Sequence, residues 1–185
     1  VSTNPASGTT PVEKIEFINE GAGTPRNGSA DATGNLASTF GNDVFMRVKS
    51  NGTTITGEYS VDGTTWTPVG QSAALPANAK VGVFALSNAA ATVVNAKFDY
   101  VTLEGENVPS PFTPGDDFNG TALDKSRWNA IVSEDATKYT VGNGGLTTTT
   151  VEGDINTTSD PSGTRNLFLQ SADHAGSDFV IATKP

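Results

Sequence analysis

Residues 44–66 have the sequence VFMRVKSNGTTITGEYSVDGTTW, and this stretch decides the fold class. Apolar side chains occupy Val44, Met46 and Val48, whereas basic side chains occupy the positions that follow Met46 and Val48. Because successive side chains of an extended strand point to opposite faces, this two-residue period predicts a half-buried β-strand. Asn51-Gly52 follows at once, and such dipeptides supply the positive φ angles of a tight turn. The stretch therefore predicts two antiparallel strands joined as a hairpin.

The same two-residue pattern recurs along most of the chain, and no segment of the sequence has a sustained helical period. The other expected strands are residues 12–19, 53–60, 80–87, 92–104, 128–133, 146–151, 167–170 and 178–183. Further turn dipeptides occur at Asn27-Gly28, Asp62-Gly63, Asn119-Gly120 and Asn143-Gly144. Short strands that alternate with such turns are typical of antiparallel sandwiches, so we predict an all-β sandwich.

The composition limits the functions open to the chain. Its 185 residues suffice for one ordinary domain or two small ones. Eleven basic residues against 20 acidic ones give a net charge of -9, so nucleic acid and anionic membranes would be repelled. The absence of cysteine excludes disulfides, thiolate nucleophiles and Cys-ligated zinc. The single histidine, His174, lies among loop-forming residues, which excludes a multi-histidine metal site and makes a Ser-His-Asp triad a poor hypothesis.

The sequence carries no sign of membrane insertion or targeting. No apolar run approaches the roughly 20 residues that a membrane-spanning helix needs. The first residues, Val1-Ser-Thr-Asn-Pro5, have neither the basic nor the apolar region of a signal peptide. We therefore expect no membrane span, and a targeting segment that is either absent or already removed.

The composition changes once along the chain, at residues 106–115. Three prolines in this segment remove backbone donors and favour an extended path, so we interpret it as a linker between residues 1–105 and 116–185. The first part carries six basic and nine acidic residues, and the remainder carries five and eleven. Both parts are acidic, so charge does not suggest different functions for them.

Three stretches together resemble one family, the bacterial concanavalin A-like jelly-roll modules attached to secreted glycoside hydrolases. That group includes the sandwich domain that closes family-43 β-xylosidases. Residues 44–66 resemble its late strands, and residues 80–86 with 96–103 resemble its final strands. Residues 116–128, followed by Gly145-Leu146 and Gly153-Asp154, resemble its opening. Residues 1–105 are thus similar to the back part of a module and residues 116–185 to the front part, in inverted order.

The inverted order allows three interpretations. A half sandwich would expose an apolar sheet face and an unpaired edge, both unfavourable in water. We therefore favour the two parts packing together as one circularly permuted jelly-roll sandwich. The alternatives are a segment of a tandem array in which neither module is whole, and completion of each part by a second chain.

The resemblance implies a non-catalytic, extracellular carbohydrate-binding or accessory module of a polysaccharide-active bacterial protein. Its partners would be a polysaccharide or oligosaccharide and neighbouring modules of a larger chain, and tandem copies would raise its modest affinity. The alternative is a structural or self-assembling repeat of a surface protein, closed into homo-oligomers by strand exchange. A glycosidase is the weakest hypothesis, because related sandwich enzymes mark their acid pair with a Glu-x-Asp-x-x-Glu strand and this sequence has none.

Four aromatic residues are the candidates for contact with a sugar: Tyr59, Trp66, Tyr100 and Tyr139. Trp66 ends a stretch one residue short of the Asp-box pattern of sialidase-like propellers. The structural interpretation is that Asp62-Gly63 forms a hairpin turn and that Tyr59 and Trp66 meet across the strands. The functional interpretation is that one of these rings stacks on a pyranose face. Tyr100 and Tyr139 would lie on the concave face or at its rim.

Calcium is the one cofactor that the resemblance suggests. Concanavalin-like sandwiches often carry a structural calcium ion near the joined ends of the first and last strands. Asp99 lies near one such end, and Asp116 with Asp117 lies near the other. Carboxylate oxygens suit Ca²⁺, although solvated acidic loops would have the same sequence. The resemblance also places Trp128 at a buried position near the first strands, so we expect it in the core.

Overall fold

A computed structural model describes residues 2–4, 12–17, 30–33, 44–75, 77–87, 95–105, 115–152, 166–170 and 178–184. Most of the expected linker, residues 106–114, lies outside these ranges, as do His174 and the expected turn at Asn27-Gly28.

Within these ranges the protein is all-β apart from one short 3-10 helix, η1 (Ala136–Lys138), which confirms the all-β part of the prediction. The strands are β1 (Ser2–Asn4), β2 (Val12–Phe17), β3 (Ala30–Thr33), β4 (Phe45–Asn51), β5 (Thr54–Ser60), β6 (Thr67–Ala74), β7 (Gly82–Val83), β8 (Leu86–Ser87), β9 (Asn95–Phe98), β10 (Tyr100–Glu104), β11 (Tyr139–Val141), β12 (Leu146–Thr149), β13 (Val151–Glu152), β14 (Phe168–Leu169) and β15 (Asp178–Lys184). Almost all of the strand pairs are antiparallel, which is consistent with a β-sandwich.

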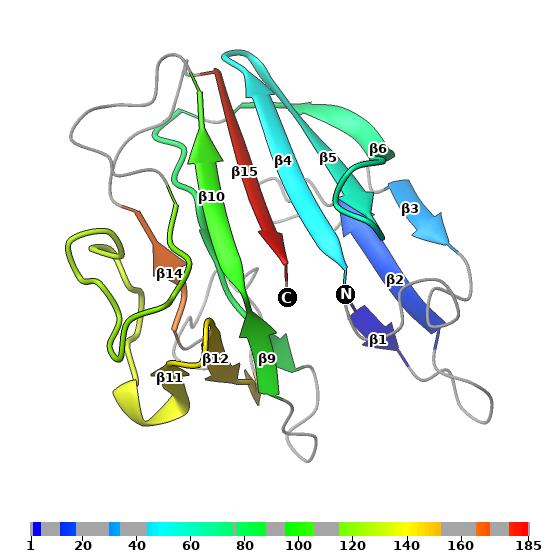
Figure 1. Cartoon of the computed structure of the whole chain (residues 1–185). Helices are drawn as coiled ribbons and strands as arrows, with labels where there is room; N and C mark the ends of the chain where they lie inside the picture. Colours follow the sequence, from blue (N-terminus) through cyan, green and yellow to red (C-terminus); the bar gives the residue numbers. More distant parts are fainter. Residues whose placement is uncertain are drawn as a thin grey trace.

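The largest sheet has five antiparallel strands in the order β10-β15-β4-β5-β6. Figure 1 shows β15, in red, lying between β10 and β4. Val101 of β10 is the partner of Thr183, and Ile181 of β15 is the partner of Val48 in β4. The strand closest to the carboxyl end of the sequence therefore fills an interior position among strands that precede residue 105.

Smaller sheets complete the fold, with the orders β1-β2-β3, β11-β12-β9, β14-β7 and β13-β8, the last of which is parallel. The last three also join a strand that precedes residue 105 to strands that follow residue 115. An isolated bridge makes a further link, because the backbone N–H of Val101 donates to Asp116 O (2.9 Å) and the N–H of Asp116 donates to Val101 O (2.7 Å). Backbone hydrogen bonds thus connect the two sides of residues 106–114 at several places.

The main hydrophobic core draws on both sides of that segment. Its buried members are Val83, Phe98, Val101, Phe118, Leu123, Trp128, Leu146 and Phe168. Trp128 is 1% exposed and its ring stacks on Phe118 with the centroids 5.9 Å apart, which confirms its predicted core position. Its indole N–H donates to Asp116 Oδ2 at 2.8 Å, so burial leaves this polar group satisfied. A smaller cluster of Val81 and Leu103 shares Ile181 with the main core.

Several predicted turns are present. Gly52 has a φ of 82° between β4 and β5, and Gly63 has a φ of 73° between β5 and β6. Asn143 and Gly144 have φ angles of 53° and 65° between β11 and β12, as a tight hairpin requires.

The expected strands differ from the observed ones at several places. Residues 128–133 do not form a strand, because Trp128 ends a turn in which its N–H donates to Asp124 O at 2.9 Å, and Val132 makes only an isolated bridge to Leu167. Conversely, β1, β3, β6 and β11 form where no strand was expected, and β6 does so despite Pro68 and Gly70. Proline is tolerated there because β6 is the edge of the five-stranded sheet, where one side of each backbone needs no ladder partner.

Candidate functional site

The five-stranded sheet has two chemically different faces. Val101 and Leu103 of β10 are each 1% exposed and point into the core, which defines the inner face. Because side chains alternate along a strand, Tyr100 points to the opposite, outer face, and its register partner Lys184 does so too. The same alternation in β4 places Met46 and Val48 on the inner face, and Phe45, Arg47 and Lys49 on the outer one.

Arg47 is the centre of a contact network on the outer face. Its guanidinium carbon lies 3.9 Å from the centroid of the Trp66 ring, a distance typical of a cation–π contact. Its Nε donates to Glu58 Oε2, and Lys49 Nζ donates to Glu58 Oε1 at 3.1 Å. The Arg47 and Glu58 side chains are only 23% and 13% exposed, so this ion pair is partly shielded from solvent.

The turn between β5 and β6 brings Trp66 to this network. Asp62 Oδ1 accepts hydrogen bonds from the backbone N–H groups of Thr64 and Thr65, both at 2.7 Å, and from the Ser60 hydroxyl at 2.9 Å. These bonds favour the ionised carboxylate, so they hold the pKa of Asp62 far below its ordinary value. A Cβ on Gly63 would lie 3.2 Å from the Phe45 ring, so the turn passes closely over Phe45.

A second contact group lies at the end of β10. Asp99 Oδ1 accepts a hydrogen bond from Lys97 Nζ at 2.6 Å, and its Oδ2 accepts one from Lys184 Nζ at 3.0 Å. These two bonds lower the pKa of Asp99. Lys184 Nζ also lies 5.8 Å from the centroid of the Phe45 ring. Burial raises the pKa of Tyr100, beside Lys184.

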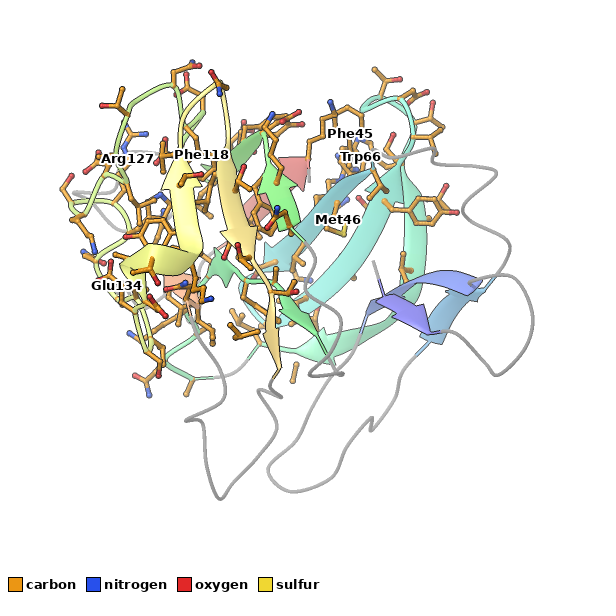
Figure 2. The ribbon with its side chains drawn as sticks, turned by 90° about the horizontal axis from the view of Figure 1, so that it is seen from below. Phe45, Met46, Trp66, Phe118, Arg127 and Glu134 are labelled. Atoms are coloured by element: carbon orange, nitrogen blue, oxygen red, sulfur yellow. The ribbon has the colours of Figure 1, made fainter. Side chains whose placement is uncertain are left out.

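Together these groups form what we call the outer-face strip: Phe45, Arg47, Lys49, Glu58, Trp66, Lys97, Asp99, Tyr100 and Lys184. Aromatic and cationic side chains alternate along it, because Lys184 stands between Tyr100 and Phe45 and Arg47 lies against Trp66. Figure 2 shows Phe45 and Trp66 in the region of β4 and β5, well apart from Phe118, Arg127 and Glu134. Phe45, Trp66 and Tyr100 are all half-buried, so part of each residue reaches the surface.

The strip contains two of the four aromatic residues expected to contact sugar, Trp66 and Tyr100. Tyr59 is opposite Met46 and Thr67 in the sheet, on the inner face, so it does not share a face with Trp66. Tyr139 is in β11, where its ring packs edge-on against Phe168 with centroids 5.1 Å apart. Its hydroxyl donates to Glu134 Oε1 at 2.6 Å, and burial followed by this bond raises its pKa.

The three aspartates proposed as calcium ligands each have other partners. Asp116 accepts from the Phe118 N–H at 2.9 Å and from the Trp128 indole, so its two oxygens each hold a donor. Asp117 accepts from both the backbone and the side-chain amide of Asn119, at 3.2 and 2.6 Å. Asp99 is bound by two lysines, as described above. Over the ranges that the structure describes, no three acidic or histidine side chains are grouped to hold a metal ion.

Comparison with known proteins adds no relatives: no family model, curated protein or solved structure matches this chain. The described segments also contain no helix long and apolar enough to cross a membrane.

Acidification is expected to destabilise the fold through Glu58 and Asp99. Burial raises the pKa of Glu58, but the hydrogen bonds and charges of Arg47 and Lys49 outweigh it, so the pKa lies below its ordinary 4.5. That of Asp99 lies below its ordinary 3.8. As the pH falls, the two carboxylates are therefore protonated in the unfolded chain before they are protonated in the folded one. Their contribution to stability is complete above their ordinary pKa values and is lost as the pH falls through their lower pKa values in the folded state.

Urea unfolding followed by circular dichroism from about pH 6 to pH 3 measures this loss. We expect the unfolding midpoint to fall with pH less steeply in the double variant Glu58→Gln with Asp99→Asn than in the wild type. Glu104→Gln removes an exposed carboxyl of the same sheet and controls for net charge. An unchanged slope in the double variant would contradict the prediction.

Proposed function

We propose that this protein is a non-catalytic, extracellular carbohydrate-binding module of a polysaccharide-active bacterial protein, and that the outer-face strip is its glycan site. The observation that carries the proposal is the placement of Phe45, Trp66 and Tyr100. All three rings lie on the outer face of one sheet, half-buried among cationic side chains, although the molecule has a core elsewhere that buries other large rings.

The chemistry of the strip suits a sugar. The C–H groups of a pyranose complement an aromatic face, and the hydroxyl groups need hydrogen-bond donors and acceptors beside it. Trp66 and Arg47 supply this combination at one end of the strip, and Tyr100 and Lys184 supply it at the other. The backbones of Phe45 and Tyr100 are paired with neighbouring strands, so these two residues lose little freedom on binding, which favours affinity.

We further propose that the architecture is a circularly permuted concanavalin A-like jelly roll. The bridge between Val101 and Asp116 supports this, because it joins a stretch that resembles the final strands of such modules to one that resembles their opening. The position of β15 between β10 and β4 supports closure within one chain rather than by a neighbouring copy. Both features favour a recognition module over a repeat that is completed by strand addition between copies.

The electrostatics of five carboxyl groups favour binding over general-acid catalysis at those groups. A general acid of a glycosidase needs a carboxyl whose pKa is raised so that it holds a proton near neutral pH. Glu58, Asp62, Asp99, Asp124 and Glu134 each have a pKa that lies below its ordinary value. These groups are therefore ionised partners of cations and N–H donors.

Binding to an array of plant and bacterial polysaccharides tests the proposal. We expect Trp66→Ala to weaken binding to a retained glycan by about tenfold or more, which corresponds to ~1.4 kcal/mol, because the stacking ring is lost. Val61→Ala is the matched control, since Val61 is 48% exposed in the same turn and has no part in the strip. Retention of no glycan by the wild type, or equal losses in the two variants, would overturn the proposal. Concentration-dependent oligomers without glycan binding would favour the structural alternative.

A further inference from the structure

The outer-face strip differs in charge from the rest of the molecule. It carries four cations, Arg47, Lys49, Lys97 and Lys184, and two carboxylates, those of Glu58 and Asp99, so its net charge is +2. The whole chain has a net charge of -9, which leaves -11 for everything else. The next acid on the outer face of β10, Glu104, is four residues from Tyr100, roughly 13 Å along the strand.

The cations of the strip already bind carboxylates. Glu58 is shared by Arg47 and Lys49, and Asp99 is shared by Lys97 and Lys184. An ammonium group has three donors and a guanidinium has five, so two carboxylates engage only part of the donor capacity of these four side chains. Further carboxylates presented beside the rings would meet the same donors with charge-assisted hydrogen bonds.

From this charge pattern we propose that the ligand of the strip is an acidic polysaccharide whose pyranose rings carry carboxylates, a polyuronate. This inference rests on the proposed glycan-binding function and names its substrate class. The sugar rings stack on Trp66 and Tyr100, while the uronate groups pair with Arg47 and Lys184. The acidic remainder of the surface repels the same polymer, so a polyuronate is directed to the strip alone.

Isothermal titration calorimetry with polygalacturonate and with neutral arabinoxylan, in 20 mM and 300 mM NaCl, tests the inference. At low salt we expect polygalacturonate to bind at least about tenfold more tightly than arabinoxylan. The affinity for polygalacturonate should fall in high salt, because exposed charges are then screened. Arg47→Gln and Lys184→Gln should each lower that affinity several-fold. Lys125→Gln is the matched control, because Lys125 also pairs with a carboxylate, Glu134, but lies outside the strip.

The outcomes separate the two proposals. Tighter binding of arabinoxylan, lost in Trp66→Ala, would overturn the polyuronate assignment and leave glycan binding standing. Tighter binding of a sulfated glucan or of oligothymidylate would also overturn it, because the strip would then select negative charge or bases rather than uronate. If Lys125→Gln lowers the affinity for polygalacturonate as much as the strip variants do, the binding site does not lie on the strip. Binding of none of these polymers would overturn the polyuronate assignment, and the polysaccharide array described above would then decide the proposed function.

Discussion

Ala182→Pro is expected to lower the free energy of unfolding by about 3 kcal/mol, or to prevent folding altogether. Ala182 is opposite Thr102 of β10 on one side and Arg47 of β4 on the other. In an interior strand every backbone N–H faces a neighbouring strand, so proline removes a ladder bond and leaves its carbonyl partner unpaired. Typical domains have only 5–15 kcal/mol of stability, so this loss is a large share of it.

Urea unfolding monitored by circular dichroism measures the effect. Ala182→Ser is the matched control, since it keeps the backbone N–H and a small side chain at the same half-buried position. We expect its midpoint to stay close to that of the wild type. A proline variant as stable as the serine variant would show that β15 is not an interior strand of the sheet.

Trp128→Ala is expected to cost about 3–5 kcal/mol of stability, the range for truncating a large buried ring. The ring is 1% exposed, stacks on Phe118 and belongs to a core that also contains Phe98 and Val101 from the other side of residues 106–114. The cavity would therefore weaken contacts on both sides of that segment at once. We expect the unfolding transition to remain a single step at a lower urea concentration.

Two further variants define the cause of this loss. Trp128→Phe keeps most of the ring but leaves Asp116 Oδ2 without its indole donor, so we expect an intermediate cost of about 1–3 kcal/mol. Val132→Ala shortens a side chain that is 39% exposed and should change stability by less than about 0.5 kcal/mol. Two separate unfolding transitions in any of these proteins would contradict a shared core.

The local features of this fold could be predicted from the sequence because they depend on neighbouring residues. The alternation of Val44, Met46 and Val48 with basic residues fixes the two faces of β4, and the register confirms them. Asn51-Gly52 and Asp62-Gly63 likewise carry the positive φ angles of their turns within the dipeptide itself. Trp128 was expected in the core, and it is there.

Features that depend on distant pairing could not be predicted. Nothing in residues 178–184 indicates that this strand lies between β10 and β4, because its alternation is compatible with any antiparallel neighbour. Residues 128–133 have the composition of a strand, but they begin in a turn where the Trp128 N–H donates to Asp124 O and the Trp128 ring is buried. In β6, Pro68 obscures a strand whose edge position makes the missing donor harmless.

The same limit applies to the candidate site. Trp66 and Tyr100 were candidates because a single aromatic residue in a sequence already suggests a ring that can stack on a sugar. Phe45 and Arg47 were missed as members of the candidate site, although the alternation in β4 already places them together on the polar face. Lys184 could not be found at all, since its position beside Tyr100 and Phe45 arises only when β15 enters the sheet.

The interior position of β15 also has a consequence for biosynthesis. A ribosome makes residues 178–184 after every other strand described here. Until that segment emerges, the edges of β10 and β4 that pair with β15 have no partner within the chain. During this interval the nascent chain can pair those edges with other polypeptides, and premature release would leave a gapped, aggregation-prone species. Expression yield should therefore be unusually sensitive to truncation just before residue 178.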